Sequence, residues 1–215
     1  MRLLLPWLVL APVIAWQEPV VSLPSAPPPQ SPASARPLDA EPPALFALRC
    51  GEESLSFRDG EPFVLPAAWG GQECSLERLP LRRFEIPGAL AFEYPDGARW
   101  LAAIHVPEFL WWHVGLDREF AMLQRHRGTG DAAHHRDLYA GNCLKAGGED
   151  LGECSILLGG RELRGRRVSG QSDEPYVQEI FGFEHAGETW LLVLNHGEPA
   201  PRPLRDRLLA SFRFL

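Results

Sequence analysis

Histidines and carboxylates lie close together in one short stretch of the sequence. They are His126, Asp131, His134, His135 and Asp137, and side chains of these types bind metal ions in proteins. On a helix, Asp131 and His135 share a face one turn apart, whereas His134 and His135 point about 100° apart and cannot both join one simple site. The spacing is not that of H-E-x-x-H. The stretch is either a metal site or, as the spacing favours, a solvated helix start with a local Asp–His pair.

A pair of adjacent tryptophans is the second candidate, in the run Phe109-Leu110-Trp111-Trp112-His113. Adjacent side chains of a strand point to opposite faces, so one tryptophan should enter the core. The other lies under a helix or is partly exposed, where it can stack on a sugar or bind an apolar ligand. A sheet covered on both faces buries apolar side chains on each, so we expect both tryptophans between layers.

A basic run contains Arg161, Arg164, Arg166 and Arg167, with Glu162 among them. The alternation predicts one solvated strand face whose aliphatic stems lie on the sheet. Anion binding is the alternative, although charge runs usually face solvent.

Other signatures of catalysis are missing from the sequence. It contains no G-x-S-x-G elbow and no glycine-rich phosphate loop after a strand. Glu149, Asp150 and Glu153 are expected in a loop that can bind calcium weakly, but their spacing is not that of an EF-hand. We therefore predict no catalytic residue, no cofactor and no bound metal.

Four cysteines, Cys50, Cys74, Cys143 and Cys154, all follow the N-terminal segments. An even number of cysteines in an exported chain indicates disulfides, and pairing between sequence neighbours predicts Cys50–Cys74 and Cys143–Cys154. Zinc is the rival interpretation, but no C-x-x-C pair is present. Pairing of all four would leave no thiol nucleophile.

The N-terminus predicts export. Arg2 precedes an apolar stretch that ends near Val13 and Ala15, which suit a cleavage site, so residues 1–15 read as a signal peptide. The alternative is a retained anchor, although a spanning helix needs about 20 apolar residues and two prolines interrupt this run. No later stretch is long enough to span a bilayer, so we expect no stable membrane span after cleavage.

Residues 16–44 are rich in proline, serine and alanine. Such a segment buries too little apolar surface to offset its ordering entropy, so it predicts a disordered, extended linker. Docking of a proline-binding partner on it is the alternative.

Residues 45–215 are long enough for a single domain. Hydrophobic runs separated by tight turns predict strands at residues 45–49, 55–58, 63–65, 83–86, 90–94, 99–105, 109–113, 119–124, 154–158, 162–168, 176–184 and 190–194. The continuous apolar run 190–194 predicts a central strand covered on both sides. Helices are expected at 131–145, capped by Asp131, and after Pro203, although the end of the second also alternates like a strand.

The predicted fold class is α+β, an antiparallel sheet of about seven to ten strands with helices packed on it as a layered sandwich. The run Leu90-Ala91-Phe92-Glu93-Tyr94-Pro95 with Trp100, and the ending Ser211-Phe212-Arg213-Phe214, resemble exported PsbP-like domains. The resemblance covers about a sixth of the chain. It implies an α/β/α sandwich and an extracytoplasmic accessory or binding domain without known catalytic residues.

The net charge of −7 argues against nucleic acid as a partner, because phosphate binding relies on a basic surface. A single lysine among many arginines is typical of a G+C-rich bacterial genome. The sequence thus predicts a periplasmic or secreted, non-enzymatic domain that binds an envelope or extracellular protein or a small ligand. A metal-dependent enzyme using residues 126–137 is the alternative, and an assembly factor for other exported proteins is a third possibility.

Overall fold

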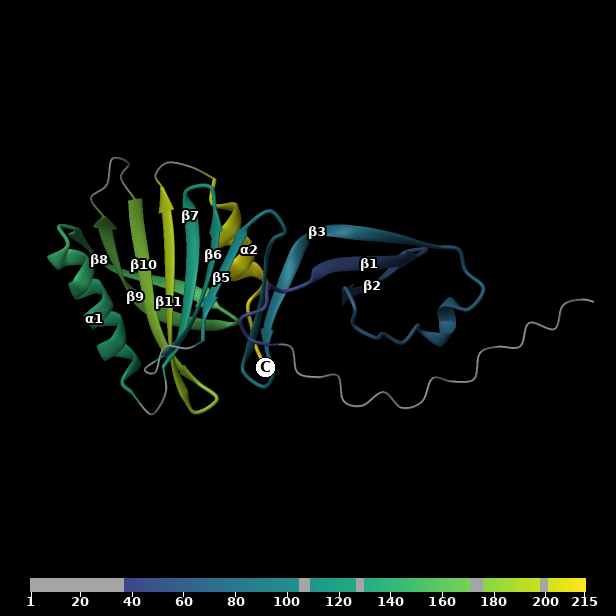
Figure 1. Cartoon of the computed structure of the whole chain (residues 1–215), viewed down its shortest axis with the longest axis horizontal. Helices are drawn as coiled ribbons and strands as arrows, with labels where there is room; N and C mark the ends of the chain where they lie inside the picture. Colours follow the sequence, from purple (N-terminus) through teal and green to yellow (C-terminus); the bar gives the residue numbers. More distant parts are fainter. Residues whose placement is uncertain (1–36, 105–108, 127–129, 171–175, 198–200) are drawn as a thin grey trace, which may run out of the picture. The chain divides into compact units, whose positions relative to one another are not determined.

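Two antiparallel sheets and two α-helices make up the described part of the chain (Figure 1). The computed structural model describes residues 37–104, 109–126, 130–170, 176–197 and 201–215. The predicted signal peptide and most of the predicted linker lie outside these residues and stay predictions. None of the helices in the described ranges is long and apolar enough to cross a membrane.

The first sheet has five strands in the order β12-β4-β3-β1-β2. Its strands are β1 (Ala44–Cys50), β2 (Glu53–Arg58), β3 (Cys74–Ile86), β4 (Leu90–Pro95) and β12 (Arg213–Phe214). A short 3-10 helix, η1 (Ala67–Trp69), lies between β2 and β3. The predicted strand at 63–65 is wrong: prolines flank it on both sides, and its three side chains are exposed.

The second sheet has seven strands in the order β5-β6-β7-β11-β10-β9-β8. Its strands are β5 (Arg99–Ala103), β6 (Phe109–Leu116), β7 (Glu119–His126), β8 (Glu149–Leu158), β9 (Arg161–Gly170), β10 (Tyr176–His185) and β11 (Glu188–Gly197). β11 lies inside the sheet, and residues 189–196 are all buried, which confirms the central strand that the apolar run predicted.

The prediction of a single sheet is therefore corrected to two. Arg213 and Phe214 pair with Ala91 and Leu90, so β12 occupies the free edge of β4. β5, which follows β4 in the chain, pairs with β6 in the other sheet instead. The α+β class and the antiparallel pairing are as expected.

The helices pack on opposite faces of the seven-stranded sheet. α1 (Ala132–Lys145) lies on β9, β10 and β11, and α2 (Pro203–Ser211) contacts β4, β7 and β8. Asp131 caps α1 as expected, because its Oδ1 accepts a hydrogen bond from the N–H of Ala133. We call the face that carries α1 the outer face and the opposite one the inner face.

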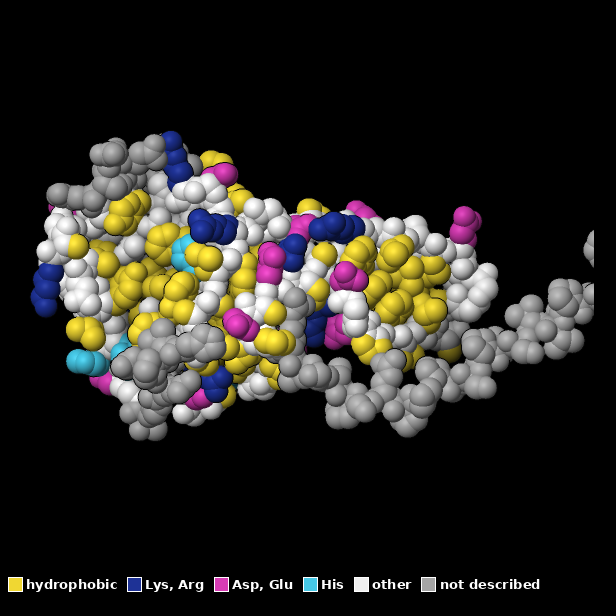
Figure 2. All heavy atoms as spheres, in the orientation of Figure 1, with side chains coloured by type: hydrophobic (Ala, Val, Ile, Leu, Met, Phe, Trp, Pro, Cys, Tyr) yellow, Lys and Arg dark blue, Asp and Glu magenta, His cyan; other side chains and the backbone are white. Residues whose placement is uncertain are grey.

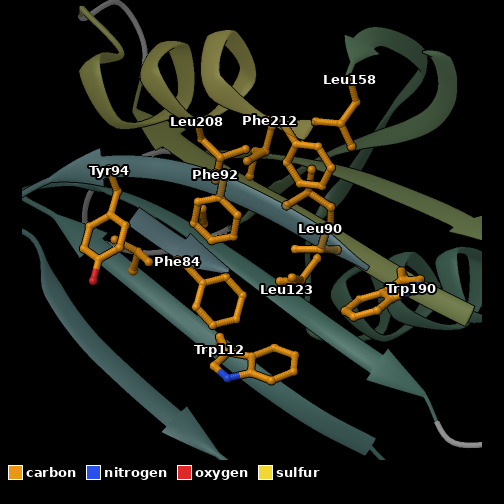
Figure 3. Close-up of a cluster of buried hydrophobic side chains, with 14 of the residues drawn as sticks. Phe84, Leu90, Phe92, Tyr94, Trp112, Leu123, Leu158, Trp190, Leu208 and Phe212 are labelled. Atoms are coloured by element: carbon orange, nitrogen blue, oxygen red, sulfur yellow. The ribbon is translucent and has the colours of Figure 1, made fainter. Parts of the chain in front are cut away.

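The main hydrophobic core lies between the two sheets and α2 (Figure 3). Trp112 and Trp190 from the seven-stranded sheet meet Phe84 and Phe92 from the five-stranded sheet, and Leu208 closes the core from α2. A smaller cluster on the outer face packs under α1. The two aromatic segments behind the family resemblance lie together, since β4 pairs with β12.

Leu38 and Asp39 come from the C-terminal end of the predicted linker. The indole N–H of Trp112 donates to the Leu38 carbonyl at 2.8 Å, and that of Trp100 donates to the Asp39 carbonyl. Leu38 also packs against the main core. The ordered unit spans Arg36–Leu215, so this end of the linker belongs structurally to the domain.

One of the two predicted disulfides is present. Cys50 and Cys74 lie opposite each other on β1 and β3 and are bonded. Cys143 and Cys154 are free thiols, which corrects the second predicted pair. Cys143 belongs to α1 on the outer face, whereas Cys154 on β8 packs against the inner core, so the sheet separates them.

Candidate functional site

The structure brings two of the predicted metal-ligand candidates together. His126 ends β7, and His135 lies one turn into α1; their rings stack with centroids 3.8 Å apart. His134 meets His135 edge-on, with centroids 5.9 Å apart. On the other side of His126 lies Phe109, with ring centroids 5.5 Å apart.

The carboxylates do not join these imidazoles. Asp131 is committed to the helix cap, and Asp137 forms an ion pair with Arg136, with Oδ1 and Nε 2.8 Å apart. Within the described ranges, no three His, Cys, Asp or Glu side chains gather as metal ligands. The arrangement agrees with a solvated helix start, except that His126 stacks on His135 instead of pairing with an aspartate.

Protonation of His126 should destabilise the fold. Burial, together with the positive charge on His135, lowers the pKa of His126 to about 4. The folded state therefore favours the neutral ring, and its stability should fall as the pH drops from 6.5 towards 4. We expect a loss of roughly 1 kcal/mol, because the ring is only half-buried and solvent screens its charge.

Urea unfolding as a function of pH tests this expectation. The substitution His126→Phe keeps a flat ring on His135 but removes the titrating group, so it should flatten the stability profile between pH 6.5 and 4.5. Burial and Arg99 lower the pKa of His113 in the same direction, so His113→Phe is the companion variant. An unchanged slope in the double variant would contradict the assignment.

The outer face of β5, β6 and β7 carries a second cluster of side chains, where α1 does not lie over the sheet. We call it the open face. It consists of Leu101, Phe109, Trp111, His113, Phe120 and Met122. Figure 2 shows hydrophobic side chains gathered beside α1 on this part of the molecule, around a histidine.

The rings of the open face contact one another. His113 lies between Phe120, at 4.9 Å between centroids, and Trp111, which it meets edge-on at 6.4 Å. Leu101 lies opposite His113 in the ladder and is 39% exposed. Trp111 is half-buried, whereas Trp112 is fully buried in the core. The two tryptophans thus point to opposite faces as predicted, but only Trp112 lies between layers.

The predicted basic run does not form one solvated face. Arg161 lies over the ring of Phe214, 4.1 Å from its centroid, and Arg167 points inward to Glu179. Arg166, on the outer face, pairs with Asp150. The acidic residues expected in a calcium-binding loop instead belong to β8.

Sequence reasoning missed a buried charge cluster around Glu179 on β10. The carboxylate is 2% exposed, and it accepts hydrogen bonds of 2.9 Å from Arg167 on β9 and from Arg205 on α2. The Nε2 atom of the buried His196 lies 3.8 Å away. Burial alone would raise the pKa of Glu179, but hydrogen bonds from these three neighbours outweigh it and hold the pKa far below its usual range.

A signal for this cluster was present in the sequence. Val177, Glu179, Phe181 and Phe183 alternate along β10, so an acid occupies a core-facing position that demands a cation. The thiol of Cys154 lies within the field of the cluster. Burial, followed by the charge of Glu179, raises its pKa to about 11, which leaves it a poor nucleophile.

Comparison with known proteins finds partial similarity of fold. No protein-family model matches the sequence, and no curated protein is significantly similar to it. A cyanobacterial PsbP (CyanoP) from a Synechocystis species aligns over 63% of this chain and 93% of its own, with 12% identity and a TM-score of 0.45. LpqN of Mycobacterium tuberculosis, which is involved in cell envelope biogenesis, aligns over 62% and 91%, with 15% identity and a TM-score of 0.36. The first is a member of the family that the two aromatic segments resemble.

Proposed function

We propose that the protein is an exported binding module that holds a flat apolar group on the open face. The observation that carries this proposal is the half-exposed Trp111, which lies among other rings on a part of the sheet without a helix over it. Sheet faces in layered folds are normally covered. An uncovered aromatic face that adjoins a packed cluster therefore points to binding.

The chemistry of the open face limits what it can hold. Trp111 and Phe120 offer ring faces for stacking, and Leu101 and Met122 add apolar surface without a charge. Burial, with Arg99 nearby, lowers the pKa of His113, so its imidazole is neutral near pH 7 and supplies a hydrogen-bonding group. An aromatic ring or the apolar face of a sugar fits these groups, and no group placed for nucleophilic chemistry adjoins them in the described ranges.

The proposed location outside the cytoplasm rests on separate observations. Cys50 and Cys74 form a disulfide, and such bonds persist in oxidising compartments. The signal-like segment at residues 1–15 points the same way. The proposed role is accordingly that of a binding domain of the cell envelope or the extracellular space.

Titration with small probes, followed by NMR, tests the binding site. We expect p-cresol or a methyl glucoside to shift the indole N–H signal of Trp111 and the ring signals of His113. Trp111→Ala should weaken the binding of the active probe about tenfold or more, and Trp111→Phe should retain most of it. The more effective probe will identify an aromatic or a sugar ligand.

Leu157→Ala serves as the matched control. Leu157 is 67% exposed on β8, far along the sheet from β6, so its loss should leave both probes bound as in the unmodified protein. Shifts that avoid Trp111 and His113, or equal binding by Trp111→Ala, would show that the open face is not the site.

A further inference from the structure

The three strands that carry the disulfide expose an apolar surface of their own. We call it the arm face, and it consists of Phe46, Leu48, Leu55, Phe57, Phe63 and Leu76. Side chains on paired residues share a face of a sheet, and Leu48 lies opposite both Leu55 and Leu76. Hydrophobic atoms gather over β1, β2 and β3 in Figure 2.

The arm face is separate from both hydrophobic cores. None of its six residues belongs to either cluster, and Leu76 and Phe63 are 62% and 43% exposed. Phe46, Phe57 and Phe63 stack in sequence, with centroids 6.0 and 4.1 Å apart. The disulfide ties β1 to β3 at one end, so the exposed face is held in a fixed shape.

Charge is distributed unevenly around the arm face. Arg78 lies opposite Phe46 at one end of the strands, and its side chain is 58% exposed. Glu53, opposite Cys50, lies at the other end on the far strand. Glu52 and Glu73 beside it are also exposed. The face thus has a basic corner and, diagonally across three strands, an acidic corner.

We propose that the arm face docks on the arm face of a second copy of this chain. Two faces related by a two-fold axis can meet with Leu48 near the centre and with Arg78 of each copy over Glu53 of the other. Crossed packing of two sheets allows this arrangement. A surface with opposite charges at opposite corners is complementary to itself, which favours a second copy over an unrelated partner.

The size of the arm face sets the expected strength. Three strands spaced about 4.8 Å apart, each contributing about five residues of 3.3 Å, give a patch of roughly 15 by 17 Å. That is smaller than one side of a standard interface, about 800 Å². We therefore expect a reversible dimer with a dissociation constant on the order of 10–100 µM.

Sedimentation velocity on the full chain across a range of concentrations tests the proposal. The unmodified protein should convert from monomer to dimer, and Leu76→Glu should weaken the association about tenfold or more. Leu157→Glu places the same charge on an equally exposed leucine of β8 and should leave the dimer intact. A monomer up to about 1 mM, or equal effects of the two variants, would overturn the proposal.

A charge swap provides the second measurement. Arg78→Glu and Glu53→Arg should each weaken the dimer, and the two together should restore it, because the corner contacts re-form with reversed sign. Circular dichroism of each variant checks that it is folded. Additive weakening in the double variant would contradict the diagonal contact.

Discussion

Replacing Glu179 with glutamine should destabilise the protein by roughly 3–5 kcal/mol, because it breaks a buried ion pair and leaves cations without their counter-charge. The carboxylate joins Arg167 of β9 to Arg205 of α2, so its loss affects both the sheet and the helix that closes the core. Urea denaturation followed by tryptophan fluorescence measures the change in the free energy of unfolding.

The pH dependence of stability gives the same substitution a distinctive signature. Because the pKa of Glu179 is lowered in the fold, its stabilising effect is complete above pH 4.5 and is lost as the pH falls below that value. Glu179→Gln should therefore reduce the acid sensitivity below pH 4.5. Glu184→Gln, on an exposed residue of the same strand, should change stability by less than about 0.5 kcal/mol. Similar losses in both variants would show that the buried cluster stabilises nothing.

Valine in place of Gly182 should cost roughly 1–3 kcal/mol or more, because the position has no room for a side chain. A Cβ atom there would lie 2.0 Å from the carbonyl oxygen of Ala132, the first residue of α1. Backbone cannot move aside as a flexible side chain does, so the start of α1 must lift from the sheet. Thermal unfolding and the protection of α1 amides from hydrogen exchange measure the effect.

Gly141 within α1 provides the opposite control. A Cβ atom at this position would meet nothing within 4 Å, so Gly141→Ala should stabilise the helix by about 0.5–1 kcal/mol. If Gly182→Val and Gly141→Ala shift the unfolding midpoint in the same direction, the close approach of α1 to β10 is not what makes glycine necessary at position 182.

Local patterns in the sequence were enough to predict most strands. The alternation from Tyr176 and the unbroken apolar run from Trp190 both gave strands, and Ala186-Gly187 forms the turn between them, with positive φ at both residues. The ending after Pro203 was ambiguous between helix and strand, and both are present: α2 ends at Ser211, and β12 follows.

Features that depend on distant pairing were beyond the local signal. The first half of β3 was missed because its side chains are mostly exposed and Pro80 interrupts the run, at a point where the register with β1 shifts. Nothing near Cys143 or Cys154 in the sequence says that they lie on opposite faces of one sheet. The ligand candidates were only half right, because local spacing identified His126 and His135 but not their mutual stacking.

The position of β12 has a consequence for how the chain acquires its structure. The last residues of the protein complete a sheet begun by the first ordered ones, since β12 pairs with β4 and the Leu215 amide donates to the Ala89 carbonyl. A nascent chain that lacks its final dozen residues therefore has neither sheet sealed against the core. Because loop-closure entropy must be lost before such distant contacts form, folding should be slow and should begin only after the whole chain has been released. A protein built this way can be threaded across a membrane from its N-terminus without folding prematurely behind the pore.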